Sequence, residues 1–209
     1  MKRIGLICGG FSSEYDISIK SAHTIQKNFP PHLECILIEI SRENWQERLQ
    51  LQGKIDAALI YTHGDPGENG KIQAFLDMLQ IPFVNSGVLA SALSFDKWYC
   101  NQFLKTFNIP VAKSLFLKNI EEYTPSELVK DLGLPLFIKP SDSGSSYGIS
   151  KVKKIEDIPK ALQIAFNEGD TVVVESFLDG IEVTCGVYKS ATGISALPLT
   201  EIVSENEFF

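Results

Sequence analysis

Short apolar runs and amphipathic stretches alternate along the first ninety or so residues of the chain. Apolar runs of the length typical of buried strands occur at 3–8, 35–40 and 55–60. Helical spacing or helix-like composition occurs at 15–28, 45–51 and 68–79, and the last of these ends before Pro82. Strands separated by helices of this length predict βαβ units on a parallel sheet, an α/β fold.

A second kind of pattern begins near Phe95. Helices are predicted at 96–107, 124–131 and 155–166, and strands at 111–117, 136–139, 149–152 and 172–175. This order favours a mixed or antiparallel α+β unit, and the stretches 182–188 and 194–197 predict the start of a hairpin. We therefore predict three domains, 1–94, 95–178 and 179–209, the last of them incomplete.

The composition is that of an ordinary soluble globular protein, with 44% hydrophobic and 22% charged residues among 209. The net charge of −7 argues against a nucleic-acid partner and against an anionic membrane surface. The apolar run from Ile4 is too short to cross a membrane, which predicts a cytoplasmic protein. The four cysteines are scattered, and this spacing favours free thiols over a zinc site or a disulfide scaffold.

The loop at 141–148 is rich in glycine and serine. Glycines allow close approach of a ligand, and successive N–H groups with serine hydroxyls can cradle an anion. Lys139, just upstream at a strand end, could reach the same phosphate. A flexible turn explains the same composition equally well. The loop is not a Walker motif, because no Gly-Lys-Ser/Thr follows it and it leads into a strand.

Two polar positions follow predicted strands of the first region. His63 could donate to a developing oxyanion or bind phosphate, although a polar start to the following helix is the simpler interpretation. Glu14, after Gly9-Gly10, could bind a substrate ammonium, although on its own the sequence favours a helix N-terminal role. Because ligands gather at the carboxyl ends of parallel strands, both positions are candidates for one site.

Two glutamates, Glu175 and Glu182, flank the passage from a predicted strand into a loop. Carboxylates there could bind an adenine amino group or a ribose hydroxyl, but solvated surface glutamates are the commoner case.

Taken together and in order, these segments resemble the D-alanine–D-alanine ligases of the ATP-grasp superfamily. The resemblance covers essentially the whole chain. The matching blocks are Gly9–Glu14 with Ile17-Ser18 and Ser21-Ala22, His63-Gly64, Gly67–Gly70, Gln73, Ile81–Phe83, Ser86-Gly87, Ala90–Ala92, Asp96-Lys97, Gly133–Pro135, Ile138–Pro140, Gly144–Gly148, Lys151-Val152, Glu175–Gly180 and Glu182.

The resemblance implies a pre-ATP-grasp α/β domain, then the small ATP-grasp subdomain and the start of the large one. It implies that Glu14, with Ile17, His63 and Ser145, binds and orients the first D-alanine, and that Ser145 joins Glu14 in a hydrogen-bond relay. Lys97 and Lys139 would contact the phosphates of ATP. The remaining implied nucleotide contacts are Ser146, Glu175, Ser176, Phe177, Leu178 and Glu182.

The implied reaction supplies a peptidoglycan precursor. ATP converts the first D-alanine into an acyl phosphate, and the amine of the second D-alanine attacks it. Lysines, backbone N–H groups and Mg²⁺ or Mn²⁺ offset the negative charge that builds up, while a closing loop excludes water.

Several features depart from the family pattern or leave alternatives open. Family members are longer, and their metal ligands are expected beyond Phe209, so we expect either a longer protein or an inactive fragment and favour the first. Asn69 replaces the usual Asp, and Tyr147 replaces a smaller residue. The rival functions are a D-alanine–D-lactate ligase, another ATP-grasp carboxylate–amine ligase, and a non-catalytic nucleotide-binding module. A homodimer is an expectation from the family alone.

Overall fold

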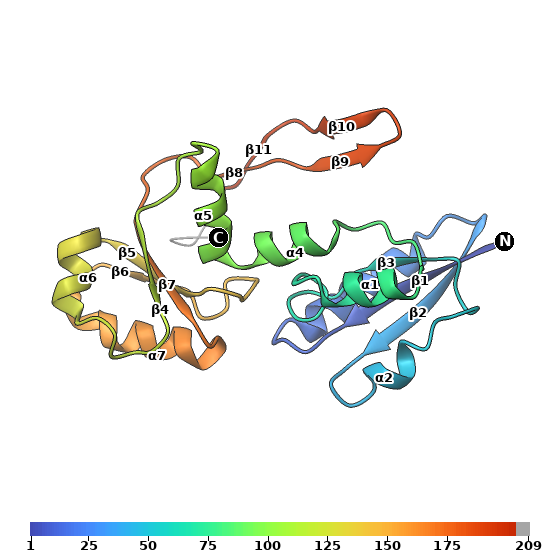
Figure 1. The fold of residues 1–209 in the computed structure, drawn as a ribbon, viewed down its shortest axis with the longest axis horizontal. Coiled ribbons are helices and arrows are strands. Elements are labelled where there is room, and N and C mark those ends of the chain that lie inside the picture. The colour runs from blue at the N-terminus through green and yellow to red at the C-terminus, as the bar shows by residue number, and fades with distance from the viewer. Residues whose placement is uncertain (204–209) are drawn as a thin grey trace. The chain divides into compact units, whose positions relative to one another are not determined.

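The computed structural model of the chain describes residues 1–203 (Figure 1). These residues form two compact units, Met1–Ser176 and a second unit that begins at Phe177. No helix in this part of the chain is long and apolar enough to span a membrane.

The first unit begins with the predicted parallel sheet. Its order is β2-β1-β3, and both strand pairs are parallel. The elements are β1 (Lys2–Gly9), α1 (Tyr15–Lys27), β2 (Leu33–Ile40), α2 (Trp45–Arg48), β3 (Ala57–Ile60) and α3 (Lys71–Met78). The βαβ prediction is confirmed, although α2 is a single turn and α3 begins three residues later than expected. Gly70, in the left-handed region at φ 87°, precedes α3.

Both faces of the parallel sheet are buried. Leu6 and Cys8 of β1 pack with Ala22 of α1 on one face. Ile7, between them in sequence, points to the other face, where it belongs to a cluster with Ile72 of α3. This alternation follows from the two-residue period of a strand. Parallel strands that are buried on both faces have nearly uninterrupted runs of apolar residues, and residues 4–8 of β1 form such a run.

Helix α4 (Val88–Phe95) was not predicted. Its sequence VLASALSF has no charged residue, so no polar face marked it as a helix. Helix α5 (Lys97–Thr106) was predicted, and Asp96 caps it by accepting a hydrogen bond from the Tyr99 N–H at 3.0 Å.

The second sheet of this unit is antiparallel throughout, in the order β4-β7-β5-β6. This outcome confirms the expected α+β pattern. The elements are β4 (Ser114–Leu117), α6 (Pro125–Leu132), β5 (Leu136–Pro140), β6 (Ser150–Val152), a 3₁₀ turn (Ile155–Asp157), α7 (Ile158–Glu168) and β7 (Val172–Ser176).

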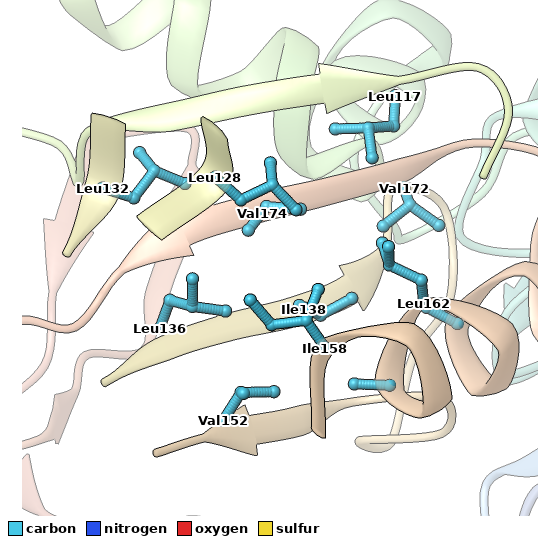
Figure 2. Close-up of a cluster of buried hydrophobic side chains, with 12 residues drawn as sticks. Leu117, Leu128, Leu132, Leu136, Ile138, Val152, Ile158, Leu162, Val172 and Val174 are labelled. Carbon is cyan, nitrogen blue, oxygen red and sulfur yellow. The ribbon is translucent and has the colours of Figure 1, made fainter. Parts of the chain in front are cut away.

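Only one face of the antiparallel sheet carries this region's apolar core (Figure 2). Ile138 of β5 and Val174 of β7 pack there against Leu128 of α6 and Leu162 of α7. The alternate positions, among them Lys139 and Glu175, lie on the opposite face.

The second unit contains four short strands. They are β8 (Val183–Thr184), β9 (Val187–Ser190), β10 (Gly193–Ala196) and β11 (Thr200–Glu201). The predicted hairpin exists as β9–β10, but the predicted single strand at 182–188 is wrong. It is interrupted at Cys185-Gly186 because β8 pairs with β11 whereas β9 pairs with β10. The domain boundaries at 94/95 and 178/179 stay predictions.

Candidate functional site

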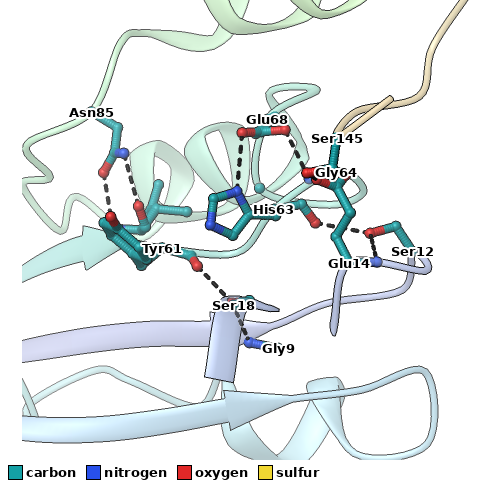
Figure 3. Close-up of polar contacts among 12 residues, drawn as sticks. Gly9, Ser12, Glu14, Ser18, Tyr61, His63, Gly64, Glu68, Asn85 and Ser145 are labelled. Atoms are coloured by element: carbon teal, nitrogen blue, oxygen red, sulfur yellow. Dashed lines mark hydrogen bonds and ion pairs between the residues drawn. The ribbon is translucent and has the colours of Figure 1, made fainter. Parts of the chain in front are cut away.

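Two loops meet at the carboxyl edge of the parallel sheet, as expected. We call residues 10–14, after β1, the first-substrate loop, because the sequence predicts that Glu14 binds the first substrate; the other loop is 61–70, after β3. The Phe11 N–H donates to the Asp65 carbonyl at 2.7 Å. The Ser12 hydroxyl donates to the His63 carbonyl at 3.0 Å (Figure 3). Positions about fifty residues apart in sequence are therefore held together by hydrogen bonds.

Glu14 is buried at the start of α1, with 2% of its surface exposed. It occupies the N-cap position, but its side chain makes no capping hydrogen bond to the helix. Instead Oε1 accepts a hydrogen bond from the Ser145 hydroxyl, 131 residues away (Figure 3). Glu14 thus lies at the helix N-terminus, as the sequence alone favoured, but its carboxylate belongs to a long-range contact.

Two glycines surround the Glu14 carboxylate. A Cβ atom on Gly144 would lie 2.6 Å from Oε2, and one on Gly64 would lie 2.9 Å from the same oxygen. Gly64 also has φ +66°, which other residues rarely adopt. Because glycine has no Cβ, the backbone of both loops can lie this close to the Glu14 carboxylate.

The Gly/Ser loop (141–148) contains backbone that non-glycine residues seldom adopt. Ser145 has φ 44° and Ser146 has φ 60°. Each left-handed non-glycine residue costs about 1–3 kcal/mol, and such residues concentrate at functional sites. The N–H groups of such a turn can form an anion-binding concavity, which favours the phosphate-cradle interpretation over a plain turn.

Lys97 and Lys139 both precede this loop in sequence, and Lys97 contacts it directly. The Lys97 ammonium donates to the Ser143 carbonyl at 2.5 Å. Burial, and then the positive charge of Lys139, lower the pKa of Lys97. Two lysines that sense each other's charge beside this loop make a region that suits phosphate.

Lys139 is already paired. Its ammonium lies 2.5 Å from Oε2 of Glu175, a buried carboxylate on the neighbouring strand. The other carboxylate oxygen, Oε1, accepts from the Asn101 side chain at 2.7 Å. Glu175 thus connects β7, β5 and α5 through charge-assisted contacts. This pairing was not expected from the sequence, which associated Lys139 only with phosphate.

His63 lies in the 61–70 loop beside Glu68. Nδ1 of His63 is 3.7 Å from Oε1 of Glu68, whose other oxygen accepts from the Gly64 N–H at 2.8 Å. The Tyr61 ring meets the imidazole edge-on, with centroids 5.6 Å apart. Glu68 thus anchors Gly64 beside Glu14, and Figure 3 shows these side chains in one cluster.

The other predicted site residues are less closely tied to this cluster. Ile17 on α1 is 42% exposed, and Ser146 belongs to the Gly/Ser loop. Ser176 ends β7. Phe177, Leu178 and Glu182 belong to the second unit, where Leu178 is 67% exposed. Their binding roles stay predictions.

Two cavities adjoin the cluster. One of about 390 Å³ is lined by the first-substrate loop, Gly64, Glu168 and part of the Gly/Ser loop. Another of about 440 Å³ is lined by Glu68, Lys97 and the same part of the Gly/Ser loop. Ser143 and Gly144 line both. Across residues 1–203, no three His, Cys, Asp or Glu side chains are grouped to hold a metal ion.

Three residues with contacts at the cluster were not singled out from the sequence. They are Ser13, Asn101 and Glu168, and each has a partner at least 74 residues away. Ser13 fell inside a matching block, which was its only signal. Nothing in the sequence distinguishes Asn101 or Glu168 from other polar helix residues.

Comparison with known proteins gives consistent results. The family model described as "D-ala D-ala ligase C-terminus" matches residues 103–209. The chain is 39% identical over its full length to a D-alanine–D-alanine ligase of Azobacteroides pseudotrichonymphae, of which it covers 71%.

Solved structures agree. D-alanyl-alanine synthetase A from Vibrio cholerae has a TM-score of 0.84 at 27% identity, over 99% of this chain and 68% of that one. D-alanine–D-alanine ligase from Bacillus anthracis complexed with ATP has a TM-score of 0.81 at 30% identity, over 97% of this chain and 67% of that one.

Proposed function

Because the chain belongs to the D-alanine–D-alanine ligase family, we propose that it carries out the ATP-dependent ligation of two D-alanines for peptidoglycan synthesis. The observation that carries the proposal is the hydrogen bond from Ser145 to the buried Glu14. It connects the loop suited to an amino acid with the loop suited to a phosphate. A ligase that activates a carboxylate with ATP needs those two ligands side by side.

In this proposal Glu14 binds the ammonium of the first D-alanine. A carboxylate favours a cation strongly where water is scarce, and Glu14 is 2% exposed. Ser145 holds Oε1, which leaves Oε2 for the substrate. Ile17 and His63 complete this pocket in the proposal, with His63 near the substrate carboxylate or the transferred phosphoryl group.

Lys97, Lys139 and the N–H groups around Ser146 contact the phosphates of ATP. Phosphoryl transfer places charge on the phosphoryl oxygens, and attack by the second amine places charge on an oxyanion. Positively charged groups fixed beside those atoms lower both barriers. Adenine and ribose contact Glu175, Ser176, Phe177, Leu178 and Glu182 in the same proposal. For Lys139 to meet phosphate, its ion pair with Glu175 must open.

Mg²⁺ or Mn²⁺ would accompany the nucleotide. Within residues 1–203 no three His, Cys, Asp or Glu side chains are grouped to hold a metal ion, and we assign no step to the metal. The proposal also places the protein in the cytoplasm, as a possible homodimer, with D-alanine and ATP as its ligands and neither nucleic acid nor membrane as a partner.

The test is phosphate release from ATP that depends on D-alanine. We expect release with D-alanine, none above background with L-alanine, and a large loss in Glu14→Gln, because the amide cannot pair with the ammonium. Equal release with both enantiomers, or none from the wild type, would remove the ligase proposal. If D-lactate serves as the second substrate as well as D-alanine does, the D-alanine–D-lactate alternative is correct.

Lys139→Ala tests the predicted contact between this lysine and the phosphates of ATP. Loss of the ammonium should weaken ATP binding, as measured by calorimetry. Unchanged affinity would remove the phosphate assignment of Lys139. A module that binds ATP with no effect of D-alanine on phosphate release would support the rival function.

A further inference from the structure

One carboxylate oxygen joins the first-substrate loop to the Gly/Ser loop. Glu168, the last residue of α7, accepts a hydrogen bond at Oε1 from the Ser13 hydroxyl at 2.6 Å. The Ser143 hydroxyl donates to the same oxygen at 3.4 Å. Ser13 precedes Glu14, and Ser143 lies two residues before Ser145. The contact is thus adjacent in sequence to both members of the buried Glu14–Ser145 pair.

Glu168 also packs against the far end of the Gly/Ser loop. A Cβ built on Gly148 would lie 3.0 Å from the Glu168 Cβ, so the backbone of the loop runs close to the end of α7. Glu168 lines the 390 Å³ cavity together with Glu14. Glu168 therefore adjoins both the cavity predicted to bind the amino acid and the loop predicted to contact the nucleotide.

The Gly/Ser loop needs such restraints. Its left-handed Ser145 and Ser146 are unfavourable unless surrounding contacts fix them. Three of the loop's contacts are those of Ser145 with Glu14, Lys97 with the Ser143 carbonyl, and Glu168 with Ser143. In the third of these contacts, the same Glu168 carboxylate also accepts a hydrogen bond from Ser13 of the first-substrate loop, next to Glu14.

We propose that Glu168 is a positioning residue that couples the first-substrate loop to the Gly/Ser loop, so that order in one loop promotes order in the other. Naming the two ligands as an amino acid and a nucleotide rests on the proposed function; the coupling of the loops does not. Coupling is reciprocal, so a ligand that orders either loop raises the affinity of the other for its own ligand.

Hydrogen–deuterium exchange tests the coupling directly. In Glu168→Ala, amides in both 11–15 and 142–148 should exchange roughly 2- to 10-fold faster, the range expected for loss of an ordinary hydrogen bond. Ser13→Ala should have the same effect on both loops, and the double variant should add little more. Glu168→Gln keeps an acceptor oxygen and should restore near wild-type exchange.

The matched control is Glu156→Ala, which removes an exposed glutamate just before the other end of α7. It should leave both loops unchanged. The proposal is overturned if Glu168→Ala accelerates exchange in neither loop or in only one, or if Glu168→Gln behaves like Glu168→Ala. Should Glu168→Ala fail to fold, Ser13→Ala decides by the same criterion.

Kinetics then tests the consequence for catalysis. Glu168→Ala should raise the KM for D-alanine by a factor similar to the change in exchange, with a smaller effect on kcat, and Glu168→Gln should restore it. A wild-type KM in Glu168→Ala would overturn the catalytic part of the proposal. Absence of phosphate release from the wild type would instead count against the proposed function, and the exchange data would still decide the coupling.

Discussion

The parallel sheet and the antiparallel sheet of the first unit contribute to the site in different ways. The parallel sheet, in residues 2–83, is buried on both faces, so only its strand ends and the loops after them are available. The antiparallel sheet, in residues 114–176, buries one face in an apolar core. Its other face carries Lys139 and Glu175, each the next-to-last residue of its strand. Chemistry in the first region is therefore carried by loops, and in the second partly by the sheet itself.

This difference also determines how each region holds its charged groups. Glu14 lies close against the backbone of Gly64 and Gly144, where an added Cβ would meet Oε2 at 2.9 and 2.6 Å. Lys139 is held by an ion pair with Glu175. The parallel region thus offers a closely surrounded anion, and the antiparallel region offers a cation that is paired with a carboxylate.

The largest expected effect tests whether the two faces of the antiparallel sheet have different roles, one in stability and the other in binding. Leu128→Ala removes a fully buried side chain from the apolar face and should lower the free energy of unfolding by about 2–5 kcal/mol. Nucleotide affinity of the folded protein should stay close to that of the wild type. Urea denaturation and calorimetry measure the two quantities.

The control is Leu89→Ala, the same change at a side chain that is 77% exposed, which should alter stability by less than about 0.5 kcal/mol. If Leu128→Ala reduced the free energy of nucleotide binding by as much as the free energy of unfolding, the two faces of the sheet would not be independent.

The next effect tests the close fit around Glu14. Gly144→Ala places a Cβ 2.6 Å from Oε2 of Glu14 and must move the loop or the carboxylate. A displacement near 1 Å can cost on the order of 100-fold in rate, so D-alanine-dependent phosphate release should fall by about that factor. Gly87→Ala, with no atom within 4 Å of its added Cβ, should keep most of the activity. Equal losses in both variants would contradict the fit.

A smaller effect concerns the cations of the nucleotide region. The pKa of Lys97 lies below its ordinary 10.5, chiefly because of burial, so its charge is present at low pH and is lost earlier as pH rises. ATP affinity should therefore fall roughly 2- to 10-fold between about pH 8 and pH 10.

Lys97→Arg isolates the contribution of this residue, because a guanidinium stays charged over that range. The decline should become shallower in the variant when both proteins are measured by calorimetry. Identical pH profiles would show that Lys97 does not carry the dependence.

The smallest effect concerns the thiols and needs no ligand. Burial raises the pKa of Cys8, inside the parallel sheet, to about 11, whereas Cys185 in the second unit is exposed. Since the thiolate is the reactive form, iodoacetamide at neutral pH should modify Cys185 first and Cys8 last. Peptide mass spectrometry over time measures the order. Modification of Cys8 as fast as Cys185 would contradict its burial.

The sequence predicted most of the secondary structure, because periodic burial leaves a periodic pattern. β1, α1 and the antiparallel strands were identified from short apolar runs and helical spacing. Helix α4 was missed because it lacks a polar face. The break at Cys185-Gly186 was missed because strand pairing, rather than local propensity, interrupts that segment.

The site was less accessible to residue-by-residue inference. For Glu14 alone the sequence favoured a helix N-terminal role, and only the family resemblance connected it to Ser145. That contact spans 131 residues, and one of the two glycines beside it, Gly64, comes from a third segment. Glu168 and Asn101 matter through partners that are distant in sequence, and one sequence without related sequences carries no signal for such pairs.

The ion pair between Lys139 and Glu175 gives the nucleotide-free protein an internal counter-ion. An incoming phosphate must replace a carboxylate 2.5 Å away rather than settle on a bare cation. A small anion that offers charge alone gains little from such an exchange, because it trades one carboxylate–ammonium contact for a similar one. A nucleotide brings further contacts that offset the exchange. Under the proposed function, the pair would thus favour a nucleotide over chloride, sulfate and free phosphate, which are simpler competitors for the same lysine.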